Sequence, residues 1–120
     1  MHAWGSALPL TVVVLATAAA SVCAEPAAPA HERQRALVRM VRQDCGSCHG
    51  MRLTGGLGPA LTREALADKP AASLAATIFH GRPGTPMPPW RALITEDEAQ
   101  WIALQLLAGL PAERPEETHR

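Results

Sequence analysis

The chain has 120 residues, with 11 Lys and Arg against 11 Asp and Glu, so its formal net charge is zero. This length predicts one small domain and excludes a large enzyme scaffold or a second domain. Nucleic-acid binding is excluded as well, because such proteins gather Lys and Arg against phosphates and Lys69 is the chain's single lysine. Hydrophobic residues make up 48% but aromatic residues only 3%. The side chains alone therefore supply few large groups for a core.

An uncharged apolar run occupies residues 7–24 and is followed by a Pro/Ala stretch. The run predicts a signal peptide over residues 1–24, with the small residues Val22 and Ala24 before the cleavage point. Two alternatives remain open: an uncleaved membrane anchor, and a lipoprotein modified at Cys23. We expect export, with membrane contact only if the leader is retained.

The remaining chain divides into three parts by composition. We expect residues 25–31 to be a disordered lead-in, residues 32–110 to form the folded domain and residues 111–120 to be a disordered charged tail. No run of alternating apolar and polar residues predicts a strand. The domain is therefore predicted to be all-α, with three main helices and long loops.

The first helix is predicted over residues 32–44. Leu37 and Val41, followed by Cys45 and Cys48, recur at helical spacing, so one face of this helix leads into the two cysteines.

The second and third helices have clear end signals. One begins near Asp68 and Pro70 and ends at Gly81, since proline is tolerated in a first helical turn and glycine ends helices. The other begins with a capping box at Thr95 and ends at Gly109. Long Gly- and Pro-rich loops separate the helices, and a core this poor in aromatic side chains needs an additional element to hold them.

The sequence Cys-Gly-Ser-Cys-His at residues 45–49 supplies that element. It is the attachment pattern of c-type haem, in which Cys45 and Cys48 add to the two vinyl groups and His49 binds the iron. Three alternatives compete with this interpretation: a disulfide, a thioredoxin-like redox pair and half of a zinc site. The redox pair lacks a βαβ surround, and a zinc site lacks two further protein ligands.

A second axial ligand is expected from the Pro-rich segment of residues 82–90, here called the strap. Met87 lies between prolines that restrict the backbone, and it follows His49 by enough residues to reach the opposite face of the haem. Met51 is too close to His49 to do so. His80 is the rival ligand, although a histidine before a helix-ending glycine is often a cap. Met87 as ordinary apolar filler is the remaining alternative.

Three glycines precede Pro59 in residues 55–59. They permit close approach of the backbone, so a carbonyl of this segment could accept the Nδ1–H of His49 and raise the basicity of the imidazole. The alternative is a flexible surface loop.

Taken together, the Cys-Gly-Ser-Cys-His motif, the Gly-Pro-Ala-Leu run at residues 58–61, the methionine in a Pro-rich loop and the final helix resemble class I cytochrome c. Within it, residues 44–62 and 81–90 are most similar to the small NirC-type monohaem cytochromes of denitrification nitrite-reductase clusters. The resemblance implies a small fold around one covalent haem, attached to Cys45 and Cys48.

The same resemblance implies a role for each site residue. Iron would be held by His49 and Met87, and Pro59 would supply the carbonyl to His49. First and last helices would pair, with Leu37 and Val41 against Trp101 and Ile102. The family often docks through a ring of lysines, which is absent here; the arginines that would substitute are Arg42, Arg52, Arg63, Arg82 and Arg91.

These features predict a periplasmic, monomeric carrier of single electrons rather than an enzyme. The resemblance implies a redox partner such as a nitrite reductase of the haem cd type, or a part in that enzyme's maturation. Two functions remain as alternatives: a haem sensor or enzyme with a displaceable sixth ligand, and a haem-free metal-binding module.

Overall fold

A computed structural model of the chain describes Met1 and residues 27–111. Residues 2–24 of the predicted signal peptide, including Cys23, lie outside the described residues, as do residues 112–120 of the expected tail. Within the described part the domain is helical and contains no strand, so the predicted all-α architecture is confirmed. None of the described helices is long and apolar enough to cross a membrane.

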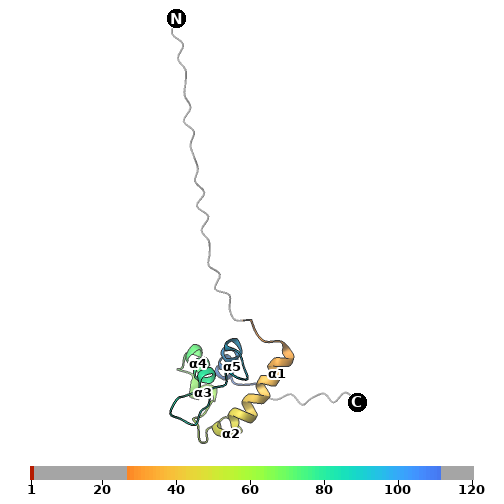
Figure 1. The fold of residues 1–120 in the computed structure, drawn as a ribbon, viewed down its shortest axis with the longest axis vertical. Helices are drawn as coiled ribbons and strands as arrows, with labels where there is room; N and C mark the ends of the chain where they lie inside the picture. Colours follow the sequence, from red (N-terminus) through yellow and green to blue (C-terminus); the bar gives the residue numbers. More distant parts are fainter. Residues whose placement is uncertain (2–26, 112–120) are drawn as a thin grey trace, which may run out of the picture.

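The N-terminal helical segment runs without a break from His31 to His49 (Figure 1). It begins as the α-helix α1 (His31–Met40) and ends as the short α-helix α2 (Gly46–His49). Between them Val41–Cys45, labelled η1, forms one π-turn, closed by a hydrogen bond from Gly46 N–H to the Val41 carbonyl. Sequence reasoning placed a regular helix here, and the π-turn corrects that prediction.

Three further helices follow. Helix α3 (Arg63–Leu66) was not predicted; it is one turn long and is capped by the Thr62 hydroxyl. Helix α4 (Ala71–His80) begins just after Pro70 and ends before Gly81. Helix α5 (Glu96–Ala108) begins with the expected capping box and ends at Gly109.

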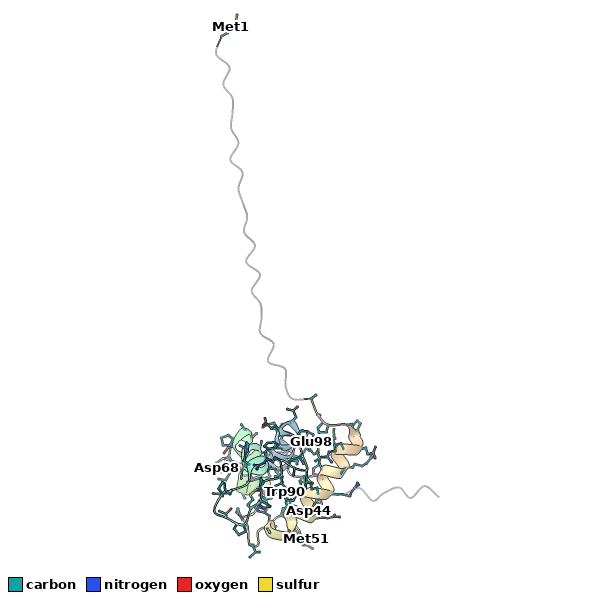
Figure 2. All side chains as sticks on the ribbon, viewed as in Figure 1. Met1, Asp44, Met51, Asp68, Trp90 and Glu98 are labelled. Carbon is teal, nitrogen blue, oxygen red and sulfur yellow. The ribbon has the colours of Figure 1, made fainter. Side chains whose placement is uncertain are left out.

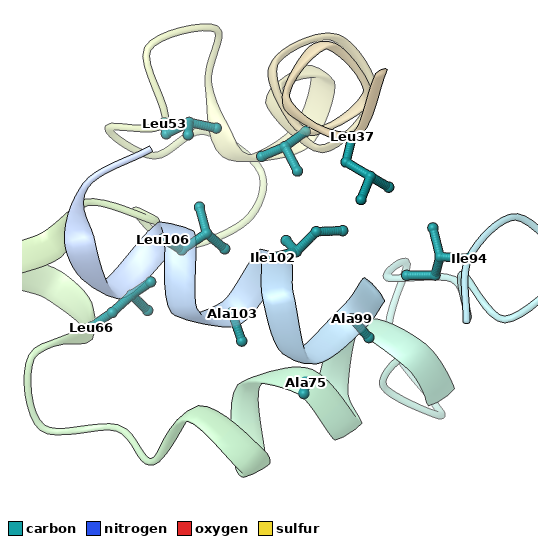
Figure 3. Close-up of a cluster of buried hydrophobic side chains, with 10 residues drawn as sticks. Leu37, Leu53, Leu66, Ala75, Ile94, Ala99, Ile102, Ala103 and Leu106 are labelled. Carbon is teal, nitrogen blue, oxygen red and sulfur yellow. The ribbon is translucent and has the colours of Figure 1, made fainter. Parts of the chain in front are cut away.

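Helix α5 lies at the centre of the core, with α4 and α3 packed against one side (Figure 3). On the other side Leu37 and Val41 share one buried cluster with Ile102, and Trp101 packs against its edge. The first and last helices therefore meet in this cluster, although their direct contact is small. The more extensive contact of α5, with α4, was not anticipated.

Two polar contacts fix the N-terminal helix relative to α5. Arg33 Nε lies 2.6 Å from a carboxylate oxygen of Glu98 in the α5 capping box. In the middle of the segment, just before the attachment motif, Arg42 donates to the carbonyls of Leu110 and Pro111, at 3.3 and 2.6 Å. The helix that carries the attachment motif is therefore held near its start and at its middle.

Candidate functional site

The two motif cysteines lie near the end of the N-terminal helix. Cys45 is the last residue of the π-turn and packs, half-buried, against the core cluster, whereas Cys48 in α2 is exposed. Both are free thiols, so the structure contains no disulfide between them. Burial, with a smaller contribution from the Asp44 carboxylate, raises the pKa of the Cys45 thiol to about 11. A reactive cysteine of a redox pair has a lowered pKa, so Cys45 does not fit the thioredoxin-like alternative.

The His49 imidazole is oriented by the loop that follows it. Its Nδ1 lies 2.6 Å from the Pro59 carbonyl, the hydrogen bond expected in this segment. Because the carbonyl can only accept, Nδ1 is the protonated nitrogen and Nε2 carries the free lone pair. The half-buried imidazole is thus set to bind a metal through Nε2.

Residues 50–60, here called the glycine loop, are bonded directly to the motif. Gly55 N–H donates to the His49 carbonyl and Gly58 N–H to the Cys48 carbonyl, both at 2.8 Å. A Cβ at Gly58 would lie 2.7 Å from the imidazole, so only glycine permits this approach. These hydrogen bonds and the close approach at Gly58 contradict the alternative interpretation of this segment as a flexible surface loop.

One residue of the glycine loop adopts a conformation that sequence reasoning did not find. Leu53 has φ +60° and is buried in the core cluster. It also accepts a hydrogen bond from Leu61 N–H at 2.8 Å. The loop is therefore anchored both to the attachment helix and to the core.

The strap is pinned to the end of α4. Trp90 and Arg91 donate their N–H groups to the carbonyls of Ile78 and Phe79, each at 3.2 Å. Gly81 has φ +69°, and a Cβ there would lie 2.6 Å from Pro89 N. Gly81 therefore has two roles: it ends α4, and its lack of a side chain allows the strap backbone to pack directly against it.

Met87 lies within this strap and is half-buried. It does not belong to the hydrophobic cluster of the described residues, unlike Met40, which packs against it. The role of ordinary core filler therefore fits Met40 better than Met87. Met51 is exposed at the end of α2, at the opposite end of the domain from Glu98 (Figure 2).

His80, the rival ligand, is exposed on the last turn of α4. Its ring packs edge-on against Phe79, with ring centroids 5.0 Å apart. The part of the chain that the structure describes contains no group of three or more His, Cys, Asp or Glu side chains placed to hold a bare metal ion.

Among the arginines expected at a docking face, Arg42 has another task. Its guanidinium holds the carbonyls of Leu110 and Pro111, and its Nε is buried without a hydrogen-bond partner. Arg42 therefore connects the N-terminal helix to the segment that follows α5, instead of contributing to a docking face. The other four arginines of that group are exposed: Arg52, Arg63, Arg82 and Arg91.

Comparison with known proteins gives concordant results. The family model "Cytochrome C oxidase, cbb3-type, subunit III" matches residues 32–104. Cytochrome c55X of Stutzerimonas stutzeri is 62% identical over 85 residues, which cover 71% of this chain and 75% of that protein. A solved c-type cytochrome NirC is 57% identical with a TM-score of 0.65, and the match covers 67% of this chain and 94% of that one. A dihydro-haem d1 dehydrogenase, NirN, is 32% identical with a TM-score of 0.55; the match covers 64% of this chain but 17% of that one.

The residues of the site fit the covalent haem that this family carries. Two thiols lie on consecutive turns of one helix, and an imidazole beside them has its Nδ1 already bonded. Partly buried apolar side chains that pack around the core cluster provide the surroundings a porphyrin needs: Leu61, Leu74, Ile78, Phe79, Trp90 and Trp101. The expected NirC-type resemblance is confirmed by the comparisons. The chain belongs to the c-type cytochromes, electron-transfer proteins with covalently bound haem c and its iron, and within them to the group of cytochrome c55X and NirC.

Proposed function

We propose that this chain is an exported, monomeric carrier of single electrons, with haem attached to Cys45 and Cys48 and iron held by His49 and Met87. Haem iron, when bound, gains and loses one electron, and a Met/His ligand pair raises its reduction potential. With two protein ligands the iron has no position for a substrate. The chain then stores an electron without chemical turnover.

The observation that carries this proposal is the hydrogen bond between His49 Nδ1 and the Pro59 carbonyl. It fixes the tautomer that leaves Nε2 available, and it limits rotation of the ring. A rigid ligand lowers the reorganisation needed when the iron changes charge. Such an arrangement suits electron transfer better than a site that must open to admit a gas or a substrate.

Electrons would pass at the face formed by Met51, Arg52 and Leu57, here called the loop face. The Leu57 side chain is 93% exposed and that of Met51 66%. The glycines on either side of Leu57 are bonded to each other, Gly56 N–H to Gly58 O, and Gly58 N–H is bonded to the Cys48 carbonyl. The exposed Leu57 therefore lies in a turn that is bonded to Cys48, a proposed haem attachment point. Such a patch, with a basic residue in it, fits a partner surface that is apolar with an acidic rim.

The partner we propose is a nitrite reductase of the haem cd type in denitrification, or an enzyme of its maturation. The relatives named cytochrome c55X and NirC support the first choice. Similarity to part of a dihydro-haem d1 dehydrogenase supports the second, because that enzyme carries a related domain within a longer chain. Stopped-flow mixing distinguishes them by rate: the reduced cytochrome is mixed with oxidised nitrite reductase, which takes up electrons, and the oxidised cytochrome with the reduced dehydrogenase, which releases them.

Replacement of the strap methionine tests the ligand assignment. In Met87→Ala we expect the near-infrared absorption band of ferric iron–sulfur ligation to disappear, and carbon monoxide to bind the reduced protein. Met51→Ala and His80→Ala are the controls and should retain the band. Loss of the band in His80→Ala, or its absence from the wild type, would contradict the assignment. Carbon monoxide binding by the wild type would favour the sensor alternative.

Docking at the loop face predicts the effect of one leucine. Leu57→Ser should slow the second-order rate with the partner about fivefold, equivalent to about 1 kcal/mol at a contact residue. Leu104→Ser is the matched control, because Leu104 is an exposed leucine on α5. The rate should also fall as ionic strength rises, since the exposed arginines attract an acidic partner. A rate unaffected by salt would remove the electrostatic part of the proposal.

Export and haem content are tested together. A pyridine haemochrome spectrum and the intact mass of protein from a cytochrome-maturing host should give one haem c per chain that begins at Glu25. A colourless product with the mass of bare polypeptide would contradict the whole assignment.

A further inference from the structure

The π-turn Val41–Cys45 separates the part of the N-terminal helix that packs on the core from the part that carries the attachment motif. It is closed by the hydrogen bond from Gly46 N–H to the Val41 carbonyl, which spans five residues where an α-helix spans four. Backbone angles on both sides remain helical: Met40 has φ −57° and ψ −46°, and Gly46 has φ −59° and ψ −27°. The helix thus continues, but with one extra residue in this turn.

An extra residue rotates everything that follows. An α-helix turns by about 100° per residue, so in an unbroken helix Cys48 would lie roughly 20° from Leu37 around the axis and His49 about 120° from it. Insertion of one residue turns the motif back by about 100°. His49 then lies roughly 20° from Leu37, and Cys48 moves about 80° to the other side.

The burial of the motif matches the rotated register. Leu37 is fully buried, and His49, which shares its face after rotation, is half-buried. Cys48, which would share that face in an unbroken helix, is exposed. Gly46 is also buried, but by a local contact and not by the core. In the structure Gly46 lies under Met51, whose Cα would be 3.5 Å from a Cβ at Gly46.

We propose that the π-turn is a positioning device for the haem-attachment motif: it turns His49 toward the interior and the Pro59 carbonyl, and it turns the Cys48 thiol toward the surface. This inference rests on the proposed haem attachment and extends it to residues 41–44, which come before the attachment motif. Gln43 is the exposed residue in the middle of the turn and acts as a spacer. We expect its side chain to be dispensable, whereas its backbone is needed because it supplies the extra residue of the π-turn.

Deletion of Gln43 tests the device, with Gln43→Ala as the matched control that keeps the residue count. In the full chain, expressed with cytochrome maturation, we expect the control to match the wild type. The deletion should lower the yield of haem-loaded protein roughly tenfold or more, as loss of orienting contacts does at metal sites. The protein recovered should show a haemochrome band shifted toward that of a single thioether bond, and an altered reduction potential. A deletion variant equal to the control in all three measurements would overturn the proposal.

A second measurement needs no variant and so remains informative if the deletion does not fold. In isotope-labelled wild-type holoprotein, the scalar coupling across the Gly46 hydrogen bond should connect its amide nitrogen to the Val41 carbonyl carbon. A coupling to the Arg42 carbonyl carbon would indicate an ordinary α-helix and overturn the inference. Failure of the proposed function is distinct from both outcomes, because it would leave the wild type and Gln43→Ala equally without haem.

Discussion

The glycine loop fixes His49 with hydrogen bonds to the attachment helix, whereas the strap fixes Met87 with prolines and close contact at Gly81. In the glycine loop, Pro59 bonds to a side chain only ten residues earlier in the chain. In the strap, the Met87 carbonyl accepts from Arg82 N–H, and only the backbone after Met87 is bonded to the end of α4, through Trp90 and Arg91. His49, one proposed ligand, is thus oriented by a bond to its own side chain, whereas Met87, the other, is placed by bonds of the backbone around it.

Both regions depend on the absence of a side chain. Gly58 leaves room for the imidazole, and Gly81 leaves room for the backbone of the strap. The two positions differ in what an added Cβ would contact. At Gly58 it would meet the His49 ring, which can rotate, whereas at Gly81 it would meet the backbone of residues 87–89, which cannot easily move away. Substitutions at these glycines should therefore affect the two proposed ligands, His49 and Met87, differently.

The largest effect is expected from Gly81→Ala. A methyl group there would lie 2.6–2.9 Å from backbone atoms of residues 87–89, in addition to the strain of an alanine at φ +69°. We expect a loss of about 3 kcal/mol in unfolding free energy, from overpacking and backbone strain together. The ferric iron–sulfur band should weaken as Met87 is displaced. Chemical unfolding and near-infrared absorption measure the two effects.

Gly84→Ala is the matched control for this variant. Gly84 lies in the same strap with φ +78°, but no atom lies within 4 Å of a Cβ built there. Its cost should be backbone strain alone, about 1 kcal/mol, with an unchanged sulfur band. Equal losses in the two variants would show that the contact at Gly81 does not position the strap.

A smaller effect is expected from Gly58→Ala. A Cβ there would lie 2.7 Å from Nδ1 and Cε1 of His49, so the ring must rotate away from the Pro59 carbonyl. We expect a loss of about 2 kcal/mol and a higher reduction potential, because a less basic imidazole stabilises ferric iron less. The sulfur band should be retained. Unfolding and potentiometry measure the change.

Gly46→Ala controls for adding a methyl group beside the motif. Gly46 has an ordinary helical φ, and the nearest atom would be 3.5 Å away. This variant should be neutral or slightly stabilising, since alanine favours helix over glycine. A potential that moves equally in both variants would contradict the role given to Gly58.

The parts of the fold that sequence predicted well are those with local signals. The capping box at Thr95 and the glycines that end α4 and α5 act through neighbouring residues, so their residue types reveal the helix ends. The π-turn has no such signal, because the spacing of Leu37, Val41 and Cys45 is equally compatible with a regular helix. Only the packing of the helix against α5 and the glycine loop distinguishes the two registers.

The same distinction applies to the candidate site. The cysteine motif is contiguous, so the sequence alone indicated its chemistry, and the glycines before Pro59 indicated a nearby carbonyl. By contrast, the contact between Gly81 and the strap joins residues that α4 and a turn bring together. Arg42 was expected at a docking face because exposure of an arginine cannot be read from its residue type. Its bonds to Leu110 and Pro111 depend on where α5 ends.

The smallest effect is expected from titration of Glu98, which contacts neither the glycine loop nor the strap. Glu98 accepts hydrogen bonds from Arg33 and from Thr95 N–H, and these lower the pKa of its carboxyl below the ordinary value. A lowered pKa in the folded state means that the stabilisation is present above the pKa of the unfolded chain and is lost as pH falls through the folded value. Unfolding free energy should therefore fall below about pH 4.5, by less than about 1 kcal/mol for this partly exposed pair.

Glu98→Gln isolates the ion pair, because glutamine can still accept the Thr95 N–H of the capping box. The decrease in unfolding free energy at low pH that Glu98 causes should disappear in Glu98→Gln. The same decrease should remain in Glu96→Gln, a matched change on the same first turn of α5. Since Glu98 joins α5 to α1 and touches neither the glycine loop nor the strap, the sulfur band and the reduction potential should stay unchanged in both variants. A shift in either would mean that the packing of α1 on α5 controls the ligands, and that the two regions are less independent than their separate contacts indicate.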